Sequence, residues 1–333
     1  MKHPALRPLR AIAAVAAVGG LATPARAEIS PFDVTHPVDD SGLGPGYGRR
    51  DLQFHLDLGF HFSSAPGSAS ASDGGPITED RIALSPHLRI VQPFGFNEVE
   101  FHWGFIWLDV DSDLASTSTF QLGNPFVAHH WTWRSLERQL RLGLGVGAPT
   151  AILRDERPEQ TLADNAALLT AAGMRGWRDY WLWAPEALSV IGQVDHYLRY
   201  SSGFVWGGQL SFGLIHGFDD NLFTEALGLT GNLLVAQADL EVAYDTRYLR
   251  SSLRGSYVTL LQREGLDGEE IPRDDNDQIS LEAGFRIRLD KVDLVVRFDL
   301  PVDRPFGFGL DDGKVWGAHI GLSTPTELRL PEE

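Results

Sequence analysis

The chain has 333 residues, of which 43% are apolar and 10% aromatic, and its formal net charge is −17. This composition is typical of a folded protein rather than a disordered one. The acidic charge argues against nucleic acid as a partner. The absence of cysteine excludes disulfides, thiolate catalysis and cysteine-based metal sites.

The N-terminus has the pattern of an export signal. Basic residues precede a short apolar run at 11–22, and Ala25-Arg26-Ala27 has the small-x-small spacing of a signal-peptidase site. The run is too short for a membrane-spanning helix, which needs about 20 residues. We therefore predict a cleaved signal peptide over 1–27, followed by a periplasmic N-terminal extension over 28–48, in a Gram-negative exported protein.

The rest of the chain alternates apolar and polar residues over long stretches. In 52–62, leucine and phenylalanine occupy the even positions, and polar residues or glycine occupy the odd ones. The segments 279–289 and 292–300 show the same alternation. Because successive side chains of a strand point to opposite faces, each segment predicts a strand with one apolar and one polar face.

Several of the candidate strands exceed the usual length of about 5–6 residues and reach the ~9–11 residues that cross a bilayer. Their connections alternate between tight turns and long polar loops, an asymmetry typical of outer-membrane barrels and not of a soluble β-sandwich. We predict an all-β fold, a transmembrane antiparallel up-and-down β-barrel of about 12 strands over 49–328, surrounded by outer-membrane lipid. The candidate strands are 49–64, 79–93, 96–112, 121–135, 137–149, 186–201, 203–217, 230–246, 249–264, 278–290, 292–302 and 315–328. The predicted long loops are 65–78, 110–120, 150–185, 218–229, 265–277 and 303–314.

Aromatic residues gather near the predicted strand ends and in the adjoining loops. Amphipathic rings prefer the headgroup layers of a membrane, which suggests aromatic girdles; packing inside the loops is the alternative. The residues concerned are Trp103, Phe105, Trp107, Trp131, Trp133, Trp177, Tyr180, Trp181, Trp183, Trp206 and Trp316.

The loop 150–185 contains the only helix that the pattern indicates. Thr161 is a candidate N-cap with Asp164 at the third position, and Gly173 suits the helix exit. We expect this extracellular loop either to fold over or into the barrel mouth as a gate, or to lie on the outer surface without a gating role.

The stretch from 122 to 151 has a more specific pattern. A Gly-Asn-Pro opens a strand, and after a tight turn a glycine-alternating strand ends in Pro-Thr. This hairpin resembles that of the outer-membrane β-barrel transporters linked to the meta-pathway of phenol degradation, which are similar in style to fatty-acid and aromatic uptake channels. The resemblance implies a barrel of roughly 12 strands and passage of small hydrophobic or aromatic molecules. The motif residues are Gly123, Asn124, Pro125, Pro149 and Thr150; Ala151 stands where the family usually has glycine.

If the apolar faces meet lipid, the polar faces line the lumen. Both charge signs occur there, so the side chains could line a transport path or pair into a network that closes the pore. The predicted lumen-lining residues are His55, Asp57, Arg89, Glu100, His102, Asp195, Arg199, Asp239, Glu241, Glu282, Arg286, Arg297 and Asp299.

These patterns favour a porin-like outer-membrane channel for small hydrophobic or aromatic solutes. A structural or surface-interaction barrel with a closed lumen and an outer-membrane lipid hydrolase are the alternatives. No motif fixes a catalytic nucleophile, so we expect no enzyme activity, no catalytic residue and no cofactor. Alternating aspartates at 109–113 are better explained by turns than by calcium, so we predict no metal site. The sequence does not indicate an oligomeric state.

Overall fold

The computed structural model describes residues 53–70, 76–94, 96–112, 116–134, 138–154, 158–218, 231–246, 248–262, 277–289, 292–302 and 315–324. The predicted signal peptide and N-terminal extension lie outside them. The strands are β1 (Gln53–Ser70), β2 (Pro76–Phe94), β3 (Asn97–Ser112), β4 (Ser116–Leu122), β5 (Phe126–Arg134), β6 (Arg138–Gly147), β7 (Ala187–Arg199), β8 (Phe204–Gly217), β9 (Gly231–Asp245), β10 (Leu249–Gln262), β11 (Asp277–Arg288), β12 (Asp293–Pro301) and β13 (Gly317–Ser323).

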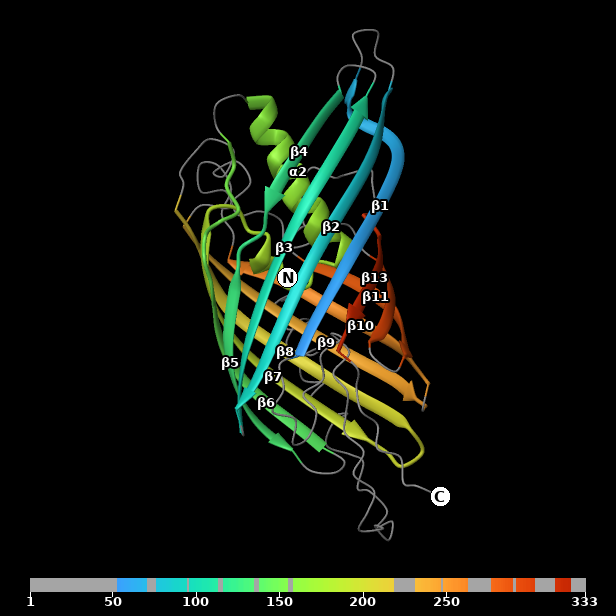
Figure 1. Cartoon of the computed structure of the whole chain (residues 1–333). Helices are drawn as coiled ribbons and strands as arrows, with labels where there is room; N and C mark the ends of the chain where they lie inside the picture. Colours follow the sequence, from blue (N-terminus) through green and yellow to red (C-terminus); the bar gives the residue numbers. More distant parts are fainter. Residues whose placement is uncertain are drawn as a thin grey trace, which may run out of the picture. The chain divides into compact units, whose positions relative to one another are not determined.

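The strands form one antiparallel sheet that closes on itself (Figure 1). Neighbours in sequence are neighbours in the sheet, and β13 pairs with β1, with Leu58 opposite Ile320. β4 and β5 both pair with β3 and together take one place in the ring. The prediction of a closed 12-stranded antiparallel barrel is therefore confirmed.

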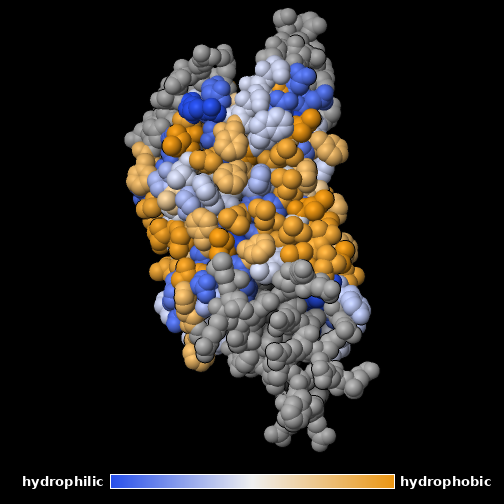
Figure 2. Space-filling view, viewed as in Figure 1, coloured by the Kyte–Doolittle hydropathy of each residue, from blue (hydrophilic) through white to orange (hydrophobic). Residues whose placement is uncertain are grey.

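The barrel has an apolar outside and a polar inside. Along β1, His55 and Asp57 are buried, whereas the neighbouring Phe54 and Leu56 are exposed. The other long strands alternate in the same way, and apolar residues cover the middle of the visible face in Figure 2. This is the period of two that the sequence shows, with the apolar face outward, as expected for strands that meet lipid.

The two ends of the barrel differ. At one end, here called the turn end, β7 and β8 or β9 and β10 are joined within four residues. At the opposite end, here called the loop end, the connections include the segments 148–186 and 218–230. Exposed aromatic residues ring the turn end, among them Phe94, Phe96, Trp131, Trp133, Tyr200, Phe204, Tyr244 and Tyr248.

Three predicted boundaries were wrong. β1 continues to Ser70 and β2 begins at Pro76, so most of the loop predicted at 65–78 is strand. The predicted loop 110–120 contains the end of β3 and most of β4. The single strand predicted at 121–135 is two strands interrupted at 123–125. The strand ends could not be recognised from the sequence because they consist of small polar residues. A hairpin that continues beyond the apolar belt of the barrel needs no apolar face.

The long connection between β6 and β7 carries the helix α2 (Pro158–Met174) and the 3-10 turn η2 (Tyr180–Leu182). The predicted helix exists, but it begins three residues before the expected start. Proline suits the first turn of a helix, where its missing N–H is not needed. In the described part of the chain, no helix combines the length and apolarity needed to cross a membrane.

Candidate functional site

Residues 158–184, here called the plug, occupy the lumen near the loop end. α2 contacts β4, β3, β2, β1, β13 and β12, which form half of the barrel wall (Figure 1). Ala167, Leu168 and Ala171 are completely buried, as is Met174 at the end of the helix. The helix therefore lies inside the barrel. A helix that lay on the outer surface of the barrel would have one face in solvent, so that alternative is excluded.

Four aromatic residues form the core of the plug. Trp177, Tyr180, Trp181 and Trp183 are at most 1% exposed. The expectation that they lie in the headgroup layer is wrong, and the alternative of packing inside the loop is correct. They are buried because the segment folds inward, so the lumen supplies the apolar contacts that lipid would have supplied outside.

Small residues of the wall make room for the plug. The Trp183 ring lies where a side chain at Gly104 or Gly123 would have to stand. Similarly, a side chain at Gly317 would collide with the backbone of Met174. These three glycines therefore mark surfaces against which the plug packs.

Asn124 fastens the plug to the wall at the break between β4 and β5. Its Nδ2 donates hydrogen bonds to the carbonyl oxygens of Trp181 (3.1 Å) and Ala184 (2.7 Å). Its Oδ1 accepts from the backbone N–H groups of Thr150 and Ala151, both at 2.9 Å. The fully buried amide thus joins the strand break to both ends of the inserted segment.

The other residues of the Gly-Asn-Pro and Pro-Thr motif surround this contact. The Thr150 hydroxyl donates to the Gly123 carbonyl oxygen at 2.8 Å, and the Ala148 N–H donates to that of Pro125 at 2.9 Å. Pro149 lies between these two contacts in sequence. The motif that suggested a family resemblance therefore forms the joint between wall and plug.

A second attachment lies at the start of α2. The Asp164 carboxylate accepts hydrogen bonds from Arg154 Nε (2.8 Å), Thr119 Oγ1 of β4 (2.5 Å) and Gln160 Nε2 (2.8 Å). Burial acts to raise the pKa of Asp164, but these donors outweigh it and lower the pKa to about 2. Asp164, predicted at the third position of the helix, instead ties it to the barrel wall. Thr161, the predicted N-cap, lies inside α2, and its hydroxyl donates to the Arg154 carbonyl oxygen.

We expect this attachment to weaken only in strong acid. A carboxyl whose pKa falls on folding contributes stability that is complete above its ordinary pKa of 3.8 and is lost as the pH drops through about 2. Hydrogen exchange of the amides in 158–174, corrected for the intrinsic rates, should stay slow from pH 7 to pH 4 and quicken toward pH 2. In Asp164→Asn the carboxylate is absent at every pH, so its exchange should lack this acid step. An equal acid step in both proteins would contradict the assignment.

All the side chains predicted to line the lumen point into it. Twelve are buried and His102 is partly buried. They come from seven strands: His55 and Asp57 from β1, Arg89 from β2, Glu100 and His102 from β3, Asp195 and Arg199 from β7, Asp239 and Glu241 from β9, Glu282 and Arg286 from β11, and Arg297 and Asp299 from β12.

Glu100 is the centre of one ion-pair group at the turn-end side of the lumen. Arg89 donates to both of its carboxylate oxygens at 2.9 and 2.8 Å, and Arg141 of β6 reaches it at 2.7 Å. His102 hydrogen-bonds the same carboxylate, and His130 lies 3.4 Å from it. Several donors on one buried carboxylate satisfy its oxygens and fix the strands relative to one another.

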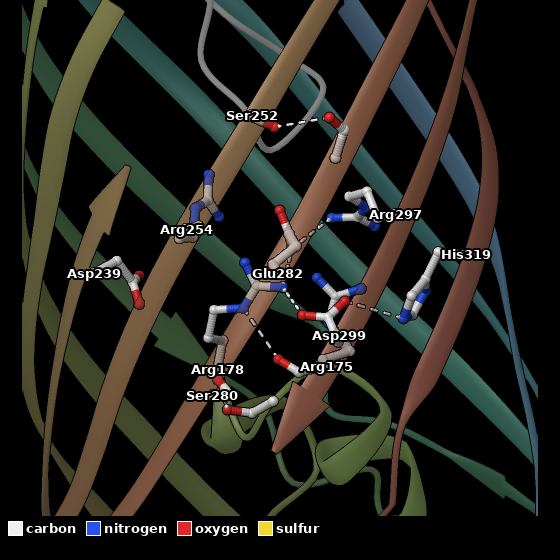
Figure 3. A network of polar contacts seen from close by, with 12 residues as sticks. Arg175, Arg178, Asp239, Ser252, Arg254, Ser280, Glu282, Arg297, Asp299 and His319 are labelled. Carbon is white, nitrogen blue, oxygen red and sulfur yellow. Dashed lines mark hydrogen bonds and ion pairs between the residues drawn. The ribbon is translucent and has the colours of Figure 1, made fainter. Parts of the chain in front are cut away.

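The second group joins the plug to the opposite wall (Figure 3). Arg178, which the sequence patterns did not single out, bonds Glu282 of β11 and lies 2.6 Å from Asp299 of β12. Beside it, Arg297 bonds Asp57. Arg178 is therefore the cation that the plug brings to two buried carboxylates of the wall.

The lumen has two zones. Toward the loop end the wall around the plug is apolar, with Ile106, Leu108, Ile191, Ile215, Leu233, Val235, Val258 and Leu260 in one cluster with the plug residues. Toward the turn end, the ion-pair groups surround a cavity of about 50 Å³ between the plug and the charged strands. A single water needs roughly 10–15 Å³ by such a measure, so the cavity has room for several waters or a small polar group.

The described residues form no metal-binding group, and the His55–Asp57 pair activates no serine among them. No group of three or more His, Asp or Glu side chains in this part of the chain could hold a metal ion. His55 lies 3.6 Å from Asp57, the pairing a hydrolase would need, but neither His55 nitrogen has a hydrogen-bond partner among the described residues. A serine activated by this pair is therefore absent from that part of the chain.

Comparisons with known proteins agree on the barrel fold. No protein-family profile and no curated protein matches the sequence. An outer membrane channel from Pseudomonas putida F1 has a similar structure, with a TM-score of 0.52 at 11% identity over 90% of this chain and 100% of that chain. The β domain of the Bordetella autotransporter BrkA gives a TM-score of 0.41 at 9% identity, over 82% and 99% of the two chains. The Pseudomonas putida toluene transporter TodX gives 0.38 at 8% identity, over 83% and 88%. At such identities the likeness to the first of these structures shows a shared fold.

Proposed function

We propose that this chain is an outer-membrane channel for small hydrophobic or aromatic solutes and that the plug is its gate. The observation that carries the proposal is the apolar zone of the lumen, which an inserted loop fills. Ion pairs cannot stabilise an apolar solute, but the wall residues around Leu108 and Val258 can. When the plug moves, this zone becomes an apolar entrance at the loop end.

The backbone of the plug supports a movable role. In the described part of the chain, the non-glycine residues with left-handed φ are Trp177 (64°), Asp179 (55°) and Glu186 (51°). Such conformations cost on the order of 1–3 kcal/mol each and collect in segments that switch. All three lie in the plug or directly after it, so the closed arrangement stores strain that an open one would release.

The membrane setting and the family belong to the same proposal. An apolar exterior with an aromatic ring at the turn end suits a barrel in lipid. The leader over 1–27 would bring the chain to the outer membrane of a Gram-negative cell. The similar structure from Pseudomonas putida F1 is described as an outer membrane channel, which supports a channel role. Kinship to the channels of the phenol meta-pathway rests on the hairpin at 122–151.

The closed-lumen alternative has one observation in its favour. Arg178 ties the plug to Glu282, and Arg297 and Arg141 tie nearby strands together inside the lumen; a barrel that serves only as a scaffold would gain from the same ion pairs. A scaffold, however, has no need of a separate loop attached to the wall through Asn124, Asp164 and Arg178. We therefore favour the gated channel.

Deletion of 156–176 from the full-length chain tests the proposal. Without the helix, single-channel conductance in planar bilayers should rise, and cells should take up the neutral aromatic dye N-phenyl-1-naphthylamine faster. A deletion of similar kind in another loop-end connection, 266–274, is the matched control. Unchanged conductance and dye uptake in the 156–176 deletion would leave the closed barrel as the better interpretation.

A further inference from the structure

We propose that the cavity below the plug is a binding site for the carboxylate of a small organic acid, held by Arg175 and His87. This inference rests on the proposed channel function and narrows its solutes to those that carry an anionic group beside an apolar or aromatic body.

The arginines of the cavity lining differ in how fully they are paired. The lining contains six arginines, four carboxylates and four histidines, and further carboxylates lie directly behind it, because Glu282, Glu241 and Asp57 bond Arg178, Arg254 and Arg297. Most of these arginines already bond a carboxylate: Arg89 and Arg141 bond Glu100, and Arg178 bonds Asp299. The lining arginine that is least engaged is therefore the candidate for binding an anion.

That arginine is Arg175, which lies one residue after the end of α2. Its guanidinium comes no nearer to a described carboxylate than 3.8 Å, the distance from Nη1 to Asp57 Oδ2. That oxygen is already hydrogen-bonded by Arg297. The Arg175 Nε is buried without a hydrogen-bond partner among the described residues. A buried guanidinium with unused donors favours a planar oxyanion, because carboxylates accept two parallel N–H bonds from arginine.

His87 of β2 supplies a second unused group on the same cavity. It is 2% exposed, and neither of its ring nitrogens has a hydrogen-bond partner in the described part of the chain. His87 and Arg175 line the same cavity. A buried imidazole without a partner is costly, and an N–H donated to a bound carboxylate would remove that cost.

The other side of the cavity is aromatic and apolar. Phe126, Trp181, Leu182 and Tyr197 belong to its lining, and the Phe126 and Trp181 rings have centroids 6.0 Å apart. Pockets that combine an apolar wall with a few convergent polar groups select ligands with both characters. An aromatic carboxylate matches this pattern if its carboxylate occupies the cavity beside Arg175 and His87 and the Phe126 and Trp181 side chains move to admit its ring, because the closed cavity of about 50 Å³ has room for the charged end alone.

Calorimetry on the full-length protein in detergent micelles tests the site with three probes at constant ionic strength. Sodium benzoate presents carboxylate and ring, sodium acetate the carboxylate alone, and benzyl alcohol the ring alone. We expect benzoate to bind more tightly than acetate. Arg175→Gln should weaken benzoate binding at least tenfold and leave benzyl alcohol unchanged, and Arg138→Gln, at an exposed position, should change neither. Absent benzoate binding, or equal benzoate affinity in wild type and Arg175→Gln, would overturn the proposal.

Two further measurements separate the site from the fold and from transport. Arg175→Lys keeps the charge, so it should lose less benzoate affinity than Arg175→Gln; an equal loss in both would mean that packing, and not anion recognition, explains the effect. Binding in micelles requires no flux. Benzoate binding without conductance after plug deletion would contradict the channel and retain the site, whereas dye uptake without benzoate binding would do the reverse.

Discussion

Replacing Asn124 with alanine is expected to release the plug from the barrel wall. The variant removes one side chain that serves two carbonyl oxygens and two N–H groups of buried backbone. Leaving buried polar groups without partners costs about 1–3 kcal/mol each, so we expect the closed plug to lose at least about 4 kcal/mol relative to the open one. Single-channel recordings should then show more frequent and longer conducting periods.

Proteolysis gives an independent measure of the same release. Arg175 and Arg178 are buried in the closed plug, so trypsin should cleave after them in Asn124→Ala at least tenfold faster than in the wild type. Asn232→Ala is the matched control, because Asn232 is exposed and its amide oxygen accepts from the His216 side chain outside the lumen. Protection of both arginines in Asn124→Ala would show that the motif does not hold the plug.

The second large effect is expected for Arg178→Met. Methionine retains much of the volume but leaves Glu282 and Asp299 without the cation that binds both. Removing one partner of a buried ion pair typically costs about 3–5 kcal/mol, because the remaining charge stays buried. We expect the plug to leave the lumen, with raised conductance and faster tryptic cleavage at Arg175.

Neutralising the two carboxylates distinguishes this explanation from a simple loss of packing. In the triple variant Arg178→Met, Glu282→Gln, Asp299→Asn, no unpaired charge remains, so conductance should return toward the wild-type value. Arg138→Met, at an exposed position near the turn end, should resemble the wild type throughout. Failure of the triple variant to restore closure would indicate that the guanidinium matters through its shape and not its charge.

The barrel itself could be predicted from local pattern. The period of two in segments such as 279–289 determines which side chains share a face, and strand geometry converts that period into an apolar outside and a polar inside. The alternation of short and long connections along the chain predicted an even number of strands in the ring. The lumen-facing positions of Asp57, Glu100 and Arg297 follow from the same alternation.

Local sequence pattern was insufficient where a segment's structure depends on residues that are distant in the sequence. Ser116–Leu122 is a strand because β3 offers it a free edge, which its own small polar residues do not reveal. Trp181 and Trp183 have the composition of a membrane girdle, and only the inward course of the chain makes them core.

By itself, therefore, the sequence determined the closed barrel, its two faces and its export pattern, since each depends on residue types at fixed short spacings. Only the tertiary structure decided which charges meet, that the 150–185 loop enters the lumen, and that Asn124 joins it to the wall. Those contacts link residues up to 240 positions apart, as Asp57 and Arg297 are, and depend on how a ring of strands brings distant side chains together.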